Sequence, residues 1–82
     1  MDSPNNWEPV EDPGTAVEAW KNKNTGMLEI RHTGQPHTEG FDLFLIIGYK
    51  EGLVEDPGIE DIEKARKKAF EWMKENPEPA RP

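Results

Sequence analysis

The chain of 82 residues contains no cysteine, and this absence excludes two common ways of stabilising a small domain. Disulfide bonds and thiolate metal sites both need cysteine, so neither can hold this fold together. The proline-rich and polar ends leave roughly sixty residues for one folded unit, which is near the lower end of what one hydrophobic core can stabilise. Self-association is the remaining aid, and we therefore expect one small domain that forms a homodimer.

Long apolar runs and glycine-rich phosphate loops are also missing. No segment approaches the ~20 apolar residues that cross a bilayer, and the first four residues lack the basic and apolar regions of a secretory signal. We expect no membrane partner and a cytoplasmic location. No P-loop or dinucleotide-type pattern occurs, and no serine lies in a recognisable nucleophile motif. The sequence predicts a protein that is not an enzyme and uses no cofactor.

Basic residues are in the minority. Ten Lys and Arg stand against 17 Asp and Glu, which gives a formal net charge of −7. This charge repels phosphate backbones and opposes non-specific binding of DNA or RNA. The simplest interpretation of this charge is that it keeps the protein soluble, because net charge affects solubility more directly than it identifies a partner.

The clearest pattern that is present is helical and covers residues 59–76. At about 100° per residue, the apolar side chains fall on one side of the helix and the charged side chains on the other. The apolar side consists of Ile59, Ile62, Ala65, Ala69, Phe70, Trp72 and Met73. Asp56 is predicted to cap the helix, with Pro57 at its first position. Because such a helix is marginal alone, its apolar side must pack on the rest of the chain.

Strands are predicted for much of the remaining chain. Residues 27–32 and 41–49 have the composition of strands, and the second segment is predicted to be the central one. A polar turn cluster at residues 20–26 favours a strand within residues 15–23 over a short helix. Residues 53–54 add a short fourth strand at an edge. We expect an α+β fold, in which an antiparallel meander of three to four strands carries the C-terminal helix on one face.

The two ends of the chain are predicted to lie outside this domain. Residues 1–9 are assigned to a flexible arm, residues 10–76 to the single domain, and residues 77–82 to a disordered tail. The arm contains Trp7, whose burial would remove a large apolar area from water. We expect this ring to dock on the protein's own sheet; the alternative is exposure to a partner.

The segment 41–49 is apolar on both faces of a strand, so it predicts cover on both sides of the sheet. The helix supplies one cover. Trp7, Trp20 or a second subunit would supply the other. This pattern is the basis for expecting a protein partner or a homodimer at the face that the helix leaves free.

A set of turn and packing residues is spread over residues 20–77: Trp20, Asn22, Thr25, Gly26, Leu28, Ile30, Ala65, Ala69, Trp72, Met73, Asn76 and Pro77. In this arrangement the chain resembles a class of small acidic proteins of haloarchaea. Proteins of that class have several strands followed by one helix that ends in Trp-Met and Asn-Pro or His-Pro. The resemblance implies the same α+β fold and an archaeal, halophilic source, although the helix lysines depart from the class. The class has no assigned activity, so the resemblance implies no site.

Two histidines are the weak candidates for a metal site. His32 and His37, with Glu39 and Asp42 nearby, include donor types that bind zinc and other transition metals. Their spacing matches no established signature, and histidines in a polar loop are more often solvated, so no metal is predicted. The acidic residues between 55 and 63 lack the spacing of a calcium hand and suit the helix dipole instead.

Four residues are predicted to take part in binding: Trp20, Arg31, Tyr49 and Arg66. Arg66 falls within the apolar side of the helix, where it either lies along the core or pairs with an anion or with a carboxylate across a subunit interface. The other three would form a basic aromatic surface if the strands place them on one face with Lys21, Lys23 and Lys50.

The predicted function is a non-enzymatic, self-associating protein-interaction module of unknown biological role. The alternative is a single-stranded nucleic-acid binder or regulatory protein that uses the exposed sheet face, and the net charge opposes it.

Overall fold

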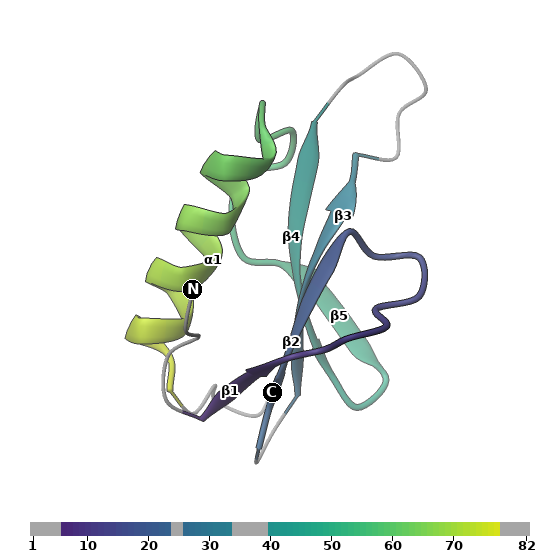
Figure 1. Cartoon of the computed structure of the whole chain (residues 1–82), viewed down its shortest axis with the longest axis vertical. Helices are drawn as coiled ribbons and strands as arrows, with labels where there is room; N and C mark the ends of the chain where they lie inside the picture. Colours follow the sequence, from purple (N-terminus) through teal and green to yellow (C-terminus); the bar gives the residue numbers. More distant parts are fainter. Residues whose placement is uncertain (1–5, 24–25, 34–39, 78–82) are drawn as a thin grey trace.

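The computed structural model describes residues 6–23, 26–33 and 40–77. Within these ranges the chain forms five strands followed by one helix (Figure 1). The elements are β1 (Trp7–Pro9), β2 (Glu18–Asn22), β3 (Met27–His32), β4 (Phe41–Ile47), β5 (Lys50–Leu53) and α1 (Ile62–Glu75). The strands form one antiparallel sheet in chain order, and α1 lies across one face. This confirms the predicted α+β meander and corrects its strand number from three or four to five.

The strand β1 is a correction to the flexible arm predicted for residues 1–9. Trp7 lies opposite Asn22, so β1 extends the sheet beyond β2. Trp7 is 2% exposed, which confirms that the arm docks by its ring. Three residues are too few to show an alternation of apolar and polar side chains, so periodicity could not reveal this strand.

The strand β5 begins earlier than the edge strand predicted for residues 53–54. The chain turns at Gly48 and Tyr49, where Gly48 adopts a φ of 62° that glycine accepts without strain. β4 therefore ends two residues before the end of the predicted segment 41–49, and β5 starts at Lys50.

The strands β2 and β3 confirm the extended interpretation of the segment before and after the polar turn. β2 lies within residues 15–23, and β3 covers Met27–His32 as predicted. Leu28 and Ile30 of β3 are both fully buried and point to the same face. β3 is the middle strand of the sheet and β4 is its inner neighbour, which reverses the predicted placement of β4 at the centre.

The helix α1 begins later than the 59–76 pattern predicted. Its N-cap is Asp61 rather than Asp56, and the Asp61 carboxylate accepts a hydrogen bond from the backbone N–H three residues later at 2.9 Å. Ile59 forms an antiparallel bridge with Phe41, so it joins the core from extended backbone. The helical spacing could not distinguish these cases, because an apolar residue three positions before the helix reaches the same side.

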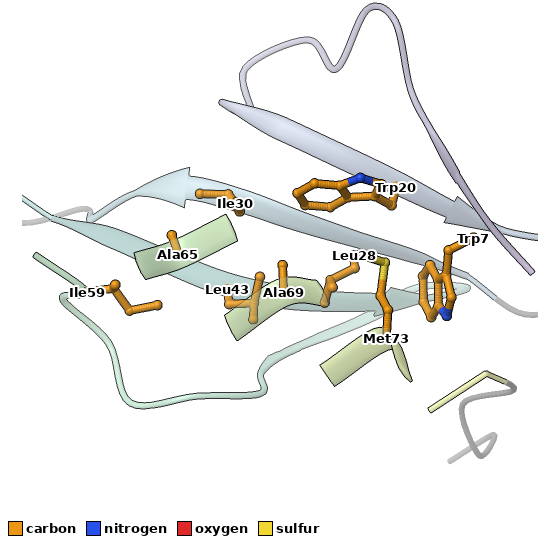
Figure 2. Packing of buried hydrophobic residues seen from close by; sticks show 9 residues of the cluster. All are labelled: Trp7, Trp20, Leu28, Ile30, Leu43, Ile59, Ala65, Ala69 and Met73. Atoms are coloured by element: carbon orange, nitrogen blue, oxygen red, sulfur yellow. The ribbon is translucent and has the colours of Figure 1, made fainter. Parts of the chain in front are cut away.

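The hydrophobic core lies between α1 and the sheet face that it covers (Figure 2). Its buried members are Trp7, Trp20, Leu28, Ile30, Leu43, Ile59, Ala65, Ala69 and Met73. Two edge-to-face aromatic pairs join the helix to the sheet: Trp7 with Trp72, and Trp20 with Phe70, with ring centroids 5.9 Å and 5.6 Å apart. These contacts fix the position of the helix and define which face of the sheet remains outside the core.

Hydrogen bonds also join the end of α1 to the first two strands. Trp7 Nε1 donates to the Asn76 carbonyl at 3.0 Å, and Asn22 Nδ2 donates to the Pro77 carbonyl at 2.9 Å. The predicted tail therefore begins with a residue that the domain holds in place. Residues 78–82 lie outside the described part of the chain.

Candidate interaction surface

The strand register places a second set of side chains on the face opposite α1. Residues of β3 and β4 that alternate with the buried Leu28, Ile30 and Leu43 must point away from the helix. The β5 residues opposite them share this face. We call the following set the open face: Met27, Glu29, Arg31, Phe44, Ile46, Glu51 and Leu53. Its apolar members are partly exposed, and Leu53 reaches 46% exposure. This face therefore has apolar surface in contact with water.

Arg31 lies in the middle of the open face and is paired within the chain. Its Nε donates to Glu29 Oε1 and its Nη2 donates to Glu51 Oε2, both at 2.8 Å. The guanidinium carbon also lies 4.4 Å from the centroid of the Phe44 ring, which is a cation–π contact. Arg31 therefore connects β3, β4 and β5, and two of its donor nitrogens are occupied before any ligand arrives.

The same contacts shift the protonation of this cluster. The hydrogen bond to Glu51 raises the pKa of Arg31 above its ordinary value, with a smaller contribution from Glu29. In return, the hydrogen bond from Arg31 lowers the pKa of the Glu51 carboxyl below its ordinary value. Both groups are therefore charged at neutral pH, and their opposite charges neutralise each other within the face.

Tyr49 lies in the turn between β4 and β5 and is fully exposed. The structure thus places it directly before β5 in the chain. Of the four predicted binding residues, Arg31 and Tyr49 are therefore on accessible surface near the β4–β5 hairpin.

Trp20 and Arg66 lie on the opposite side of the sheet. Trp20 is 5% exposed and packs under the helix against Phe70. Arg66 Nε donates to Glu18 Oε2 at 2.7 Å, and Arg66 Nη1 donates to Glu63 Oε1 at 2.8 Å. The bond to Glu18 raises the pKa of Arg66 above its ordinary value. The carboxylate partners of Arg66 are thus in its own chain.

The candidate metal residues do not converge in the part of the chain that the structure describes. No group of three or more His, Cys, Asp or Glu side chains that could hold a metal ion occurs there. His32 is exposed at the end of β3, whereas Asp42 is 8% exposed and accepts hydrogen bonds from Thr33 Oγ1 and the Gly58 N–H. Asp42 therefore ties β4 to neighbouring segments. His37 lies outside the described residues.

The strand β5 is the last strand of the sheet within the described ranges, and all of its residues are exposed. The Val54 N–H donates to the Leu43 carbonyl at 3.0 Å, so it points toward β4. Peptide groups alternate in direction along a strand, and those of Glu51 and Leu53 therefore point away from the sheet. Such outward groups are a template for another strand. The opposite edge, β1, contains Pro9, which lacks an N–H.

Lys21 of β2 lies opposite Met27. With Lys23, it lies at the part of the open face that is farther from β5. Together with Met27 and Ile46 they line a shallow hollow of about 360 Å³. Lys23 Nζ lies 3.9 Å from a carboxylate oxygen of Glu8, which is a long contact between two exposed side chains. These lysines are separated from Trp20, which lies beneath the helix.

No protein-family model, curated protein or solved structure that we compared with the chain matches it. The resemblance to small haloarchaeal proteins stays a prediction.

The sequence did not single out Met27, Phe44, Ile46 and Leu53 as surface residues. The available signal was the apolar character of both faces of the segment 41–49, which predicted an additional apolar face without identifying its neighbours. Identifying them requires the register, which places Met27 opposite Ile46 and Leu53 opposite Phe44.

Proposed function

We propose that the chain is a non-enzymatic protein-interaction module that self-associates through the β5 side of its open face. The observation that supports this proposal is the combination of partly exposed apolar side chains with an adjoining strand edge that pairs with no other described strand. Apolar contact supplies affinity in protein interfaces, and an open edge supplies directed backbone hydrogen bonds. A small domain without disulfides gains most from such an association.

The state of the charged groups favours a protein partner over a nucleic acid. Arg31 is the basic residue at the centre of the open face, and Glu29 and Glu51 already bind it. Trp20, one of the two rings on which bases were predicted to stack, is buried. A nucleic acid would also approach a chain with a net charge of −7. In contrast, a face whose central charge is paired internally suits an apolar protein surface.

Within the described ranges, no helix is long and apolar enough to cross a membrane.

The proposal is tested by sedimentation velocity over micromolar to millimolar concentrations. We expect a reversible monomer–dimer equilibrium that tightens as salt is added, because salt screens the repulsion between two chains that each carry −7. Binding of a nucleic acid would weaken with salt instead. The proposal is wrong if the chain stays monomeric across this range at both low and high salt.

A pair of variants locates the contact. Leu53→Glu adds a negative charge on the β5 side of the open face, while Thr15→Glu adds the same charge at an exposed site in the β1–β2 connection. We expect Leu53→Glu to weaken the dimer at least tenfold and Thr15→Glu to leave it nearly unchanged. Equal weakening by both variants would show that the effect arises from net charge and would contradict the assigned surface.

A further inference from the structure

Gly52 occupies the middle of β5, although nothing in the described part of the fold needs a glycine there. Three described glycines, Gly14, Gly48 and Gly58, have a positive φ of 69°, 62° and 80°. At Gly26 and Gly40 an added Cβ would press against nearby backbone atoms. Gly52 has neither property: its φ lies outside the left-handed region, and an added Cβ would meet nothing within 4 Å. Among the described glycines, it lacks an intramolecular reason.

A glycine inside a strand weakens the strand, because glycine loses more backbone conformational entropy on folding than other residues do and gives no side chain to pack. Such a glycine often marks a place where another backbone approaches closely. A glycine here leaves the backbone of β5 uncovered by a side chain, and no described segment of this chain covers it, so this bare backbone points to a second chain at the outer edge of β5.

We propose that β5 pairs antiparallel with β5 of a second copy, about a two-fold axis that passes between the two Gly52 residues. This inference rests on the self-association proposed above and specifies its geometry. The two sheets then form one continuous sheet. Because opposed residues of an antiparallel pair share a face, both helices lie on one side and both open faces lie on the other.

The direction of the peptide groups restricts the symmetric registers. Glu51 and Leu53 carry the outward N–H and C=O groups, and two opposed residues exchange hydrogen bonds only when both point outward. A symmetric pairing within β5 can therefore be centred on Lys50, Glu51, Gly52 or Leu53.

Charge selects among these registers. A centre at Lys50 or Glu51 places a residue directly opposite its own copy, which sets two like charges against each other. A centre at Leu53 places Glu51 opposite Glu55 of the second copy. The centre at Gly52 opposes Glu51 to Leu53 and Lys50 to Val54, with no like charges in contact. It also lets each Glu51–Leu53 pair exchange both of its N–H···O bonds.

Trapping by single cysteines tests the register, because the chain contains no cysteine of its own. Residues on the two-fold axis in a non-hydrogen-bonded pair have Cα atoms about 4.5 Å apart, which lies within the range that a disulfide spans. The open space at Gly52 accommodates the new side chain. We expect Gly52→Cys to form a disulfide-linked dimer at least tenfold faster than Lys50→Cys, Glu51→Cys or Leu53→Cys, as measured on non-reducing gels during mild oxidation.

A second pair of variants tests whether the backbone of β5 makes the contact. Leu53→Pro removes an N–H that points outward, and edge strands tolerate proline at such positions. Leu53→Ala removes the same side chain and keeps the N–H. With folding confirmed by circular dichroism, we expect Leu53→Pro to weaken the dimer at least tenfold more than Leu53→Ala does.

The outcomes separate the two proposals. A dimer that Gly52→Cys traps, and that Leu53→Pro disrupts more than Leu53→Ala, supports the symmetric β5 pairing. A dimer that is trapped fastest at another position, or that tolerates Leu53→Pro as well as Leu53→Ala, overturns this pairing and leaves the self-associating module in place. A wild-type chain that stays monomeric overturns both.

Discussion

Replacement of Trp7 gives the sharpest test of how this small domain is stabilised. The indole is 2% exposed, contacts the Trp72 ring edge to face, and donates from Nε1 to the Asn76 carbonyl at 3.0 Å. It therefore joins the first strand both to the core and to the end of the helix. Trp7→Ala removes the ring and its hydrogen bond, whereas Trp7→Phe keeps a ring and removes the donor.

The expected losses follow from these contacts. Truncation of a buried Trp to Ala typically lowers the free energy of unfolding by about 3–5 kcal/mol. Loss of the donor alone, which leaves a partly buried carbonyl without it, lowers it by about 1–3 kcal/mol. A domain of 82 residues has a total of roughly 4–12 kcal/mol at typical values per residue. Trp7→Ala thus removes a large share of the stability, and Trp7→Phe a smaller one.

Urea unfolding followed by far-ultraviolet circular dichroism measures these losses. Glu8→Ala is the matched control, because Glu8 lies in the same strand and is exposed. We expect its effect to stay within about 0.5 kcal/mol, as is usual for surface substitutions. A loss for Trp7→Ala no larger than that of Glu8→Ala would refute the conclusion that β1 is held by its indole ring.

Two further predictions concern polar contacts. Asp42→Ala removes the acceptor for the Thr33 hydroxyl and the Gly58 N–H, and urea unfolding should show a loss of about 1–3 kcal/mol; an unchanged midpoint would contradict the bridging role of this carboxylate. The pKa of Glu51 is lowered by Arg31 in the folded state, so this pair stabilises the fold above the ordinary pKa of Glu, and its contribution is lost as the pH falls through the folded-state pKa. Melting temperatures should therefore be higher for wild type than for Glu51→Gln at neutral pH and should converge in acid, whereas a difference that does not change with pH would contradict this linkage.

The helix was predictable because its signal is both long and local. From residue 62 to residue 75 the apolar side chains recur at the helical period, and the observed α1 lies within the predicted segment. The start was placed too early because Ile59 fits the same spacing while its backbone pairs with Phe41. Periodicity reports which side a residue faces and does not report whether its peptide bonds to the next turn or to a strand.

The edges of the sheet and the candidate surface were harder to predict. β1 and β5 are short, and turn residues adjoin β5, so neither shows a regular alternation. Among the predicted binding residues, Trp20 is a residue type that is common both in hydrophobic cores and at binding surfaces. Only its pairing opposite Leu28, on the face that α1 covers, assigns it to the core. Which face a strand residue occupies is set by its partner across the sheet, and the partner lies beyond the range of local patterns.

The position of α1 after all five strands of the described chain has a consequence during translation. The meander leaves the ribosome before the segment that shields it, so Leu28, Ile30 and Leu43 face water until the helix has been synthesised. Apolar sheet surface that is transiently bare invites association with other nascent chains. The buried face of the meander is therefore most open to such association in the interval before the helix segment, in the last quarter of the sequence, has emerged.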